Sequence, residues 1–310
     1  LIFNEADYFY EEIRKKLFNK YGEKKFYTDG LIIKTSLDSR LQKIANEALI
    51  QGLIDYDKRH GWRGSIGKVD NKNNTLKIFI TKFNNPFPKK WKIVEIKNLN
   101  KNLIYVSNEI NESMTIDLSL PDNEWLKKEK FLIGEIILVE SIKNDLVIRQ
   151  IPEVNGGIIV INPHSGDILA MSGGFSFKLS QFNRSTQAKR QPGSAFKPFV
   201  YALALENDFT PTSLVLDAPL VLDQGTDLKM WKPENYGKKF YGPSTLRIGL
   251  EKSRNLMTVR IAQNLGVDKV AEFSKNLGIY ENPDELLSIS LGSAETTLLK
   301  LTSAYSAFVN

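Results

Sequence analysis

The sequence predicts an α/β protein into which a small all-β module is inserted. Apolar residues recur at helical spacing near the start of the chain and again after about residue 194. Between residues 62 and 152, short runs rich in Ile and Val are separated by polar turn clusters. The helical pattern at 39–60 has no core of its own. We therefore expect the module to interrupt one discontinuous domain, between its first helix and its first strand.

The part of the chain before the module is predicted to be mainly helical. Residues 1–25 carry apolar side chains at helical spacing, and this pattern ends near Gly22. A turn and a short β-rich run follow. The second helix is expected over residues 39–60, where Ser39 and Gln42 form a plausible capping box.

The module is predicted to contain short strands. Several such strands, with turns at this spacing, are typical of a small barrel or sandwich. Its Trp side chains are expected to pack in the core or at its rim rather than to form a stacking surface for glycans or bases. The expected strands are 76–83, 91–96, 103–107, 114–120 and 134–142, and the Trp residues are Trp62, Trp91 and Trp125.

After the module the chain is predicted to be α/β. Two strands are expected over 157–163 and 167–174, joined by a hairpin-like turn at His164-Ser165-Gly166. Helical patterns then dominate, and the last of them has no cap or polar tail. We expect the chain to be a piece of a longer protein.

The composition of the 310 residues excludes several kinds of chemistry. There is no Cys, so disulfides, thiol catalysis and Cys-ligated zinc are excluded. His60 and His164 lie far apart beside Gly-containing turns, and we assign them no metal, cofactor or catalytic role. The net charge of +6 is spread over interspersed Lys, Asp and Glu, which favours a mixed-charge surface over a nucleic-acid site. No apolar run reaches the roughly 18–20 residues of a membrane span.

One Ser-x-x-Lys pair has the setting that nucleophilic catalysis needs. After Pro192-Gly193 a helix is expected to begin at about Ser194, so that Ser194 and Lys197 share one face. A Ser hydroxyl needs a base to remove its proton, and a Lys in a dry site can serve as that base. The alternative is a capping Ser with a surface Lys. A second pair, 65-SIGK-68, lies in β-type sequence and is background.

The wider context decides between these interpretations. The segment 182-FNRSTQAKRQPGSAFKPFVYALALE-206 resembles the active-site segment of penicillin-binding proteins, in particular the bifunctional class A enzymes. A second family motif, Ser-x-Asn, is matched by 253-SRN-255. The other Ser-x-Asn, 274-SKN-276, lies at a predicted helix end and is interpreted as ordinary helix surface. Residues 157–174 and 290–310 are similar to the family as well.

This resemblance implies a penicillin-binding transpeptidase domain of the serine β-lactamase-like α/β (α+β) fold. Residues 30–61 and 153–310 would be the N-terminal half of that domain, and 62–152 an inserted OB-like barrel. Residues 1–29 would be a linker after a glycosyltransferase domain outside this sequence. The family's third motif, Lys-Thr/Ser-Gly, does not occur in the 310 residues, so we expect the incomplete domain to be inactive alone.

Residue by residue, the resemblance implies four catalytic side chains. Ser194 would be the acylated nucleophile and Lys197 the base for acylation. Ser253 would relay a proton to the leaving amine, and Asn255 would hold the peptide backbone of the substrate. The backbone N–H of Ser194 would form half of the oxyanion hole.

The function implied is a peptidoglycan D,D-transpeptidase that β-lactams acylate, with roles in cell shape and antibiotic resistance. Its substrates would be stem peptides and lipid-linked glycan strands, with cell-wall synthesis proteins as candidate partners. The parent protein would face the periplasm from the bacterial inner (cytoplasmic) membrane, held by an N-terminal anchor outside this sequence. Two alternatives stay open. One is a serine β-lactamase or penicillin-sensing receptor, which shares both motifs, and the other is a non-catalytic module that binds nucleic acid.

Overall fold

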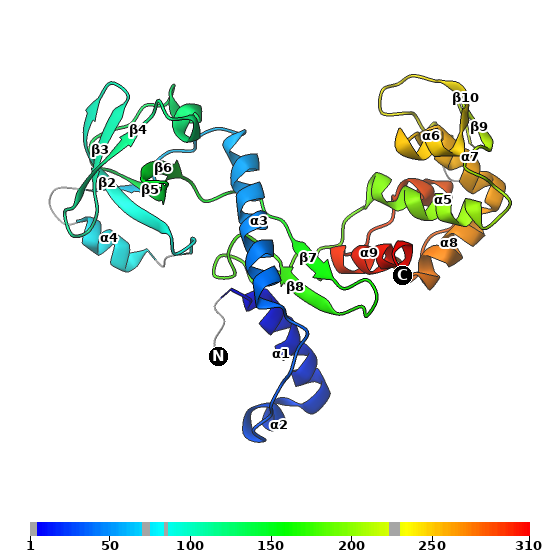
Figure 1. The fold of residues 1–310 in the computed structure, drawn as a ribbon, viewed down its shortest axis with the longest axis horizontal. Coiled ribbons are helices and arrows are strands. Elements are labelled where there is room, and N and C mark those ends of the chain that lie inside the picture. The colour runs from blue at the N-terminus through cyan, green and yellow to red at the C-terminus, as the bar shows by residue number, and fades with distance from the viewer. Residues whose placement is uncertain (1–4, 70–74, 84–85, 223–229) are drawn as a thin grey trace. The chain divides into compact units, whose positions relative to one another are not determined.

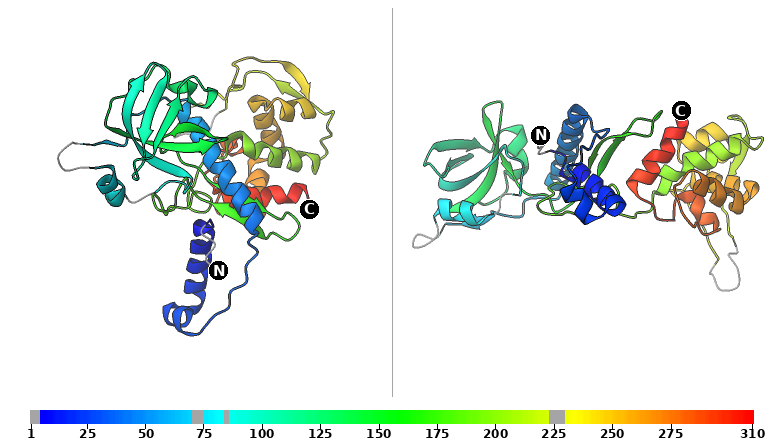
Figure 2. Two further views of the ribbon diagram at one scale, coloured as in Figure 1. Left: turned by 60° about the vertical axis from the view of Figure 1, so that its left-hand side comes forward. Right: turned by 90° about the horizontal axis from the view of Figure 1, so that it is seen from below.

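The computed structural model describes residues 5–69, 75–83, 86–222 and 230–310 (Figure 1). Contacts within the chain divide it into two compact units. The first unit, residues 1–160 and 169–183, holds the N-terminal helices and the β module (Figures 1 and 2). The second unit, residues 161–168 and 184–310, is mainly helical.

The helices predicted before the β module are present. α1 (Asp7–Tyr21) ends at Gly22, whose φ of 77° suits glycine, and a short helix α2 (Glu23–Thr28) follows. α3 (Ser39–Lys58) is the second predicted helix, two residues shorter than expected.

The predicted capping box of α3 is wrong. Asp38, not Ser39, caps the helix, because its carboxylate accepts from the backbone N–H groups of Arg40 and Leu41, both at 2.9 Å. The Gln42 side-chain amide bonds to the backbone of Met171 instead of to the start of α3. It donates to the carbonyl of Met171 at 3.0 Å and accepts from the Met171 N–H at 2.9 Å, so it pairs with the backbone as a neighbouring strand would.

The module forms an antiparallel sheet of six strands. The order is β1-β5-β2-β3-β4, and β6 pairs with β5 on the edge that β1 also uses. No pairing between β4 and β6 is present among the described residues, so the ladder of the expected barrel is not closed. The strands are β1 (Gly67–Lys68), β2 (Trp91–Asn100), β3 (Leu103–Ser107), β4 (Ser113–Asp117), β5 (Glu135–Ile142) and β6 (Asp145–Arg149), with the 3₁₀ helix η1 (Pro121–Leu126) after β4.

One expected strand of the module is a helix. Residues 76–83 form α4 (Leu76–Lys82), which begins where the Thr75 hydroxyl accepts from the N–H of Ile78 at 3.4 Å. Apolar residues in this segment satisfy both the alternating and the helical spacing, so periodicity alone does not separate the two. Packing does, because the helix places Leu76, Phe79, Ile80 and Phe83 together on one apolar cluster.

Trp91 is buried in the module, and Trp62 and Trp125 are partly buried against its core, in line with the predicted core or rim packing. Trp91 is buried beside Phe87 and Phe175, and Trp62 packs edge-on against Trp125 with a centroid separation of 5.9 Å.

The strand pair after the module is shorter than predicted and has the expected turn. β7 (Ile158–Ile161) pairs with β8 (Ile168–Ser172). The Asn162 N–H donates to the Asp167 carbonyl at 2.9 Å, and Gly166 takes the left-handed conformation with a φ of 75°.

Two buried helices form the centre of the second unit. α5 (Lys197–Leu205) is apolar on nearly every side, as its sequence KPFVYALAL requires of a helix packed all round, and it lies against α7 (Asn255–Leu265). Around them lie η2 (Gly193–Phe196), β9 (Leu214–Asp217), β10 (Gly242–Thr245), α6 (Leu246–Glu251), α8 (Val267–Asn276), η3 (Leu287–Leu291), α9 (Leu298–Tyr305) and η4 (Ser306–Phe308).

Two kinds of feature do not occur in the part of the chain that the structure describes. None of the helices there is long and apolar enough to cross a membrane. No cluster of three or more His, Cys, Asp or Glu side chains suited to a metal ion occurs in the same residues.

Candidate active site

The Ser194-Lys197 pair lies on a 3₁₀ turn that leads into a helix, rather than inside an α-helix as predicted. Residues of η2 precede α5, which begins at Lys197 with Pro198 in its first turn. A 3₁₀ helix has about three residues per turn, so positions i and i+3 still share one face. The predicted common face is therefore kept, with a tighter backbone.

Lys197 is buried and points at the second motif. Its side chain is 1% exposed, and Nζ donates to the Ser253 carbonyl at 2.7 Å, to Ser253 Oγ at 3.0 Å and to Asn255 Oδ1 at 2.6 Å. The three N–H donors of an ammonium thus meet three acceptors. Burial lowers the pKa of Lys197 from 10.5 to about 8, because the charged form is poorly solvated there. The structure therefore brings three of the four predicted site residues together.

Ser194 lies at the open side of this group. It is exposed, and no hydrogen bond joins its hydroxyl to Lys197 within the described part of the chain. The amine is held by the second motif, while Ser194 is exposed to solvent. Contacts of this kind often tighten only once substrate is bound.

Two contacts from later in the chain hold the turn that carries Ser194. The Gly193 N–H donates to the Gly292 carbonyl at 3.2 Å, and the Tyr305 hydroxyl donates to the Ala195 carbonyl at 2.6 Å. Gly292 has a φ of 72°, and a Cβ there would lie 2.3 Å from the Gly193 carbonyl oxygen. Sequence reasoning missed this glycine, since a single Gly near a helix end carries no signal of what lies against it.

Ser253 has an unusual backbone conformation. Its φ is 52°, in the left-handed region that glycine favours. Its N–H donates to Leu250 and that of Arg254 donates to Gly249, which is the bonding pattern of a Schellman helix end after α6. This bend turns the Ser253 carbonyl and hydroxyl toward Lys197. Strain of this sort in a non-Gly residue is common at functional sites.

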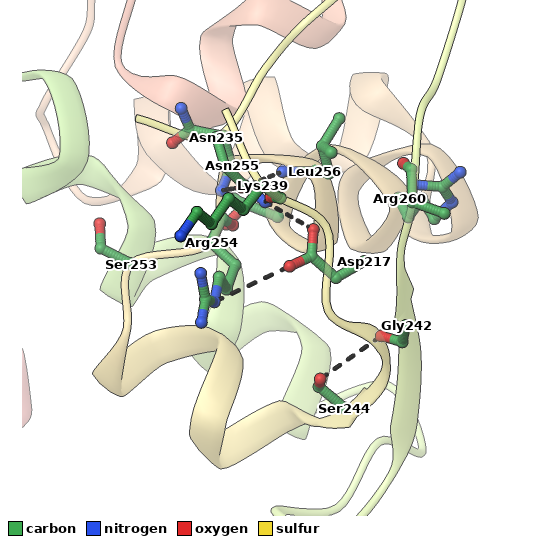
Figure 3. A network of polar contacts seen from close by, with 12 residues as sticks. Asp217, Asn235, Lys239, Gly242, Ser244, Ser253, Arg254, Asn255, Leu256 and Arg260 are labelled. Atoms are coloured by element: carbon green, nitrogen blue, oxygen red, sulfur yellow. Dashed lines mark hydrogen bonds and ion pairs between the residues drawn. The ribbon is translucent and has the colours of Figure 1, made fainter. Parts of the chain in front are cut away.

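Asn255 is fixed by residues that the sequence analysis did not single out. Its Nδ2 donates to the Glu234 carbonyl at 2.7 Å, and its backbone N–H donates to Asn235 Oδ1 at 2.9 Å. Asn235 in turn donates to the buried Asp217 (Figure 3). The only available signal was their position in a polar segment upstream of the Ser-x-Asn motif.

The rival motifs have no such setting. Residues 65–68 run into the extended strand β1, so Ser65 and Lys68 do not share a helical face, as predicted. In 274-SKN-276 the Ser274 hydroxyl is buried and donates to the Ala271 carbonyl at 2.7 Å, so this residue belongs to the helix interior rather than to its surface.

The two His side chains make local contacts. His60 Nδ1 lies 2.9 Å from the Tyr56 carbonyl oxygen, and its ring stacks on Tyr56. His164 Nδ1 lies 3.4 Å from Asn310 Oδ1. Neither contact involves the group around Lys197.

Comparison with known proteins gives consistent results. The family described as the penicillin binding protein transpeptidase domain matches residues 156–310. Penicillin-binding protein 1A of Rickettsia bellii is 41% identical over 98% of this chain, and that of Escherichia coli is 31% identical over 98%. The chain spans 39% and 38% of the lengths of these two relatives.

A solved structure resembles the whole chain. The crystal structure of penicillin-binding protein 1A from Haemophilus influenzae has a TM-score of 0.88 and 33% identity, covering 98% of this chain and 46% of that protein. The similarity therefore includes the β module. The structure of the PonA1 protein of Mycobacterium tuberculosis in complex with penicillin V has a TM-score of 0.55 and 17% identity, covering 97% of this chain and 57% of the PonA1 chain. At this identity the likeness indicates a shared fold alone.

Proposed function

The chain belongs to the penicillin-binding protein transpeptidase family, and from that premise we propose that it forms part of a peptidoglycan D,D-transpeptidase. The observation that supports this function best is the buried Lys197, held by Ser253 and Asn255 one turn after Ser194. A primary amine without exposed surface, next to a solvent-facing hydroxyl, suits activation of that hydroxyl.

Acylation follows from this arrangement. Ser194 Oγ attacks the penultimate carbonyl of a stem peptide ending in D-Ala-D-Ala, and its proton passes to the neutral amine of Lys197. A bond forms between Oγ and the carbonyl carbon, while the bond from that carbon to the terminal D-Ala nitrogen breaks. Lys197 returns the proton through the Ser253 hydroxyl to the departing amine. The 3.0 Å contact between Lys197 Nζ and Ser253 Oγ supports this path.

Cross-linking completes the cycle. The amine of a neighbouring stem peptide attacks the ester carbonyl, a new amide bond forms, and the bond to Ser194 Oγ breaks. The proton lost by the attacking amine restores the Ser194 hydroxyl. The Ser194 backbone N–H donates half of an oxyanion hole in both steps, and Asn255 holds the substrate backbone.

The lowered pKa of Lys197 makes it an effective base. With a pKa of about 8, about a tenth of the side chains are neutral at pH 7, against fewer than about one in a thousand at the usual value of 10.5. The Lys197 ammonium must give up one of its three hydrogen bonds when it loses a proton. Of its three partners only the Ser253 hydroxyl can donate, so that hydroxyl can turn its hydrogen to the freed lone pair.

The organisation of the parent protein is part of the proposal. Residues 1–29 form a linker after a glycosyltransferase domain of a class A enzyme, residues 30–61 and 153–310 the discontinuous transpeptidase domain, and residues 62–152 an OB-like domain. The antiparallel pairing of the β module supports the last assignment. Peptidoglycan strands and β-lactams are the partners. The parent is anchored in the bacterial inner membrane, on the side that faces the uncross-linked wall.

Intact mass spectrometry tests the proposal directly. The full-length protein is incubated with a penicillin, its mass is measured, and the adduct is located by peptide mapping. We expect one covalent adduct on Ser194 and none in S194A. An adduct on another residue contradicts the site assignment.

The lifetime of the adduct separates the alternatives. A transpeptidase retains it for many minutes, whereas a β-lactamase hydrolyses it at once and turns over the drug. Absence of any adduct, together with salt-dependent oligonucleotide binding, is the result expected of a nucleic-acid binder.

A further inference from the structure

Helix α7 begins without a cap from its own sequence. Its N-cap residue is Arg254, whose side chain has no acceptor atom and makes no capping hydrogen bond. The first N–H groups of the helix instead donate to a residue upstream: Asn255 N–H to Asn235 Oδ1 at 2.9 Å, and Leu256 N–H to the same oxygen at 3.4 Å. Asn235 therefore supplies the cap from outside the helix.

The orientation of the Asn235 amide is fixed by its other end. Nδ2 donates to Asp217 Oδ1 at 2.7 Å and to the Lys239 carbonyl at 2.9 Å. Both of these groups only accept hydrogen bonds, while the backbone N–H groups of α7 only donate them. A flipped amide loses all four bonds, so one orientation is strongly preferred.

Burial of the Asp217 carboxylate at this position is energetically unfavourable. Asp217 is 0% exposed, and among the described residues its Oδ2 has no hydrogen-bond partner and only a distant cationic neighbour, Arg254 Nε at 3.8 Å (Figure 3). The Arg254 guanidinium is itself stacked on Tyr241, 3.3 Å from the ring centroid. A buried carboxylate with so few partners contributes little to stability. Its well-formed bond is the one that orients Asn235.

Three contacts connect Asp217 to Lys197, the proposed general base. Asp217 holds Asn235, Asn235 holds the backbone of Asn255, and Asn255 Oδ1 accepts from Lys197 Nζ at 2.6 Å. The side chain of Asn255 is also held by the carbonyl of Glu234, the neighbour of Asn235. One loop therefore fixes both the backbone and the side chain of the residue that faces Lys197.

We propose that Asn235 and Asp217 are positioning residues for acylation, which set the Ser-Arg-Asn segment against Lys197. The inference rests on the proposed function and adds two residues to its machinery. Neither touches the reacting atoms. Their effect passes through Asn255 and the start of α7.

The first test is Asn235→Ala in the full-length protein, with the rate constant of acylation by a reporter penicillin as the readout. A misplacement of about 1 Å in an active site costs on the order of 10²-fold, so we expect acylation to slow by about 10- to 100-fold. The matched control is Ser274→Ala, which removes a buried hydrogen bond to the Ala271 carbonyl within α8 of the same unit. We expect the control to lose stability but to be acylated within about twofold of the unaltered protein.

A swapped pair supplies a readout that general destabilisation does not move. N235D alone sets two carboxylates against each other and removes the donor. The double variant D217N/N235D restores a donor-to-acceptor bond and leaves a carboxylate at the N-terminus of α7, where negative charge is favourable. We expect the double variant to be acylated at least about tenfold faster than N235D.

The outcomes are distinct. Acylation of N235A within about twofold of the unaltered protein overturns the inference, as does an equal slowing in S274A. If N235A does not fold, the swapped pair decides, and a double variant no faster than N235D overturns the inference. Failure of the unaltered full-length protein to be acylated at Ser194 contradicts the proposed function instead.

Discussion

Replacing Ser253 by Gly and by Ala separates its backbone role from its hydroxyl. Both variants lose the 3.0 Å contact between Lys197 Nζ and Ser253 Oγ, and a hydrogen bond to a charged group contributes about 1.5–3 kcal/mol. Both should therefore be acylated much more slowly than the unaltered protein, and to a similar extent, because the hydroxyl of the proposed proton relay is missing in each.

The two variants should differ in stability. At a φ of 52° an L residue sits in the left-handed region at a cost of about 1–2 kcal/mol, which Gly does not bear. The greater freedom that Gly loses on folding offsets about half of this advantage. We expect S253G to be about 0.5–1 kcal/mol more stable than S253A, or about 1–4 °C in Tm for a unit of this size.

Thermal unfolding and reporter-penicillin acylation, measured on the same preparations of the full-length protein, test both statements. Asp208 provides a control, since it has a φ of 65° and lies outside the site. Asp208→Gly should raise Tm without changing acylation. Equal stability of S253A and S253G refutes the strain argument, and unaltered acylation of either variant refutes the relay.

Three further results are expected. The acylation rate should rise with pH through about 8, the pKa of Lys197. Because this pKa is lower in the folded state than the usual 10.5, burial of the charged Lys197 lowers the free energy of unfolding fully below pH 8, and this loss of stability disappears as pH rises toward 10.5. Urea titrations at several pH values would detect it. Gly292→Ala should destabilise the unit by more than about 2 kcal/mol and slow acylation, because its Cβ meets the Gly193 carbonyl at 2.3 Å; a variant with unchanged Tm contradicts this close approach. Asp57→Ala should cost about 3–5 kcal/mol, since this buried carboxylate pairs with Arg63 where the chain enters the β module, and it should expose residues 59–63 to limited proteolysis; equal protease resistance argues against a rigid junction.

Local patterns predicted the elements whose structure depends on neighbouring residues. The helices near the N-terminus, most strands of the β module and the hairpin turn at Gly166 were correct because apolar spacing and turn residues act within a few positions. The strand predicted over residues 76–83 was wrong because the apolar residues there fit a strand and a helix equally well. The core on which α4 packs is assembled from distant parts of the chain.

Capping was predicted less well for a related reason. Ser39 satisfied the pattern of a capping box, but Asp38 caps the helix one residue earlier, on the N–H groups of Arg40 and Leu41, and the Gln42 side chain bonds to the backbone of Met171, 129 residues away. The cap of α7 comes from Asn235, 20 residues upstream of Asn255. No rule based on adjacent residues identifies a cap supplied from another segment.

The sequence by itself determined the spacing of Ser194 and Lys197 on one turn, because three residues of backbone geometry are enough to set it. Only the tertiary structure decided what Lys197 meets. Its partners lie 56 and 58 residues further along the chain, and they reach it because α5 and α7 bury their apolar faces against each other. The same packing removes water from the amine and lowers its pKa to about 8, a property that no local pattern of residues contains.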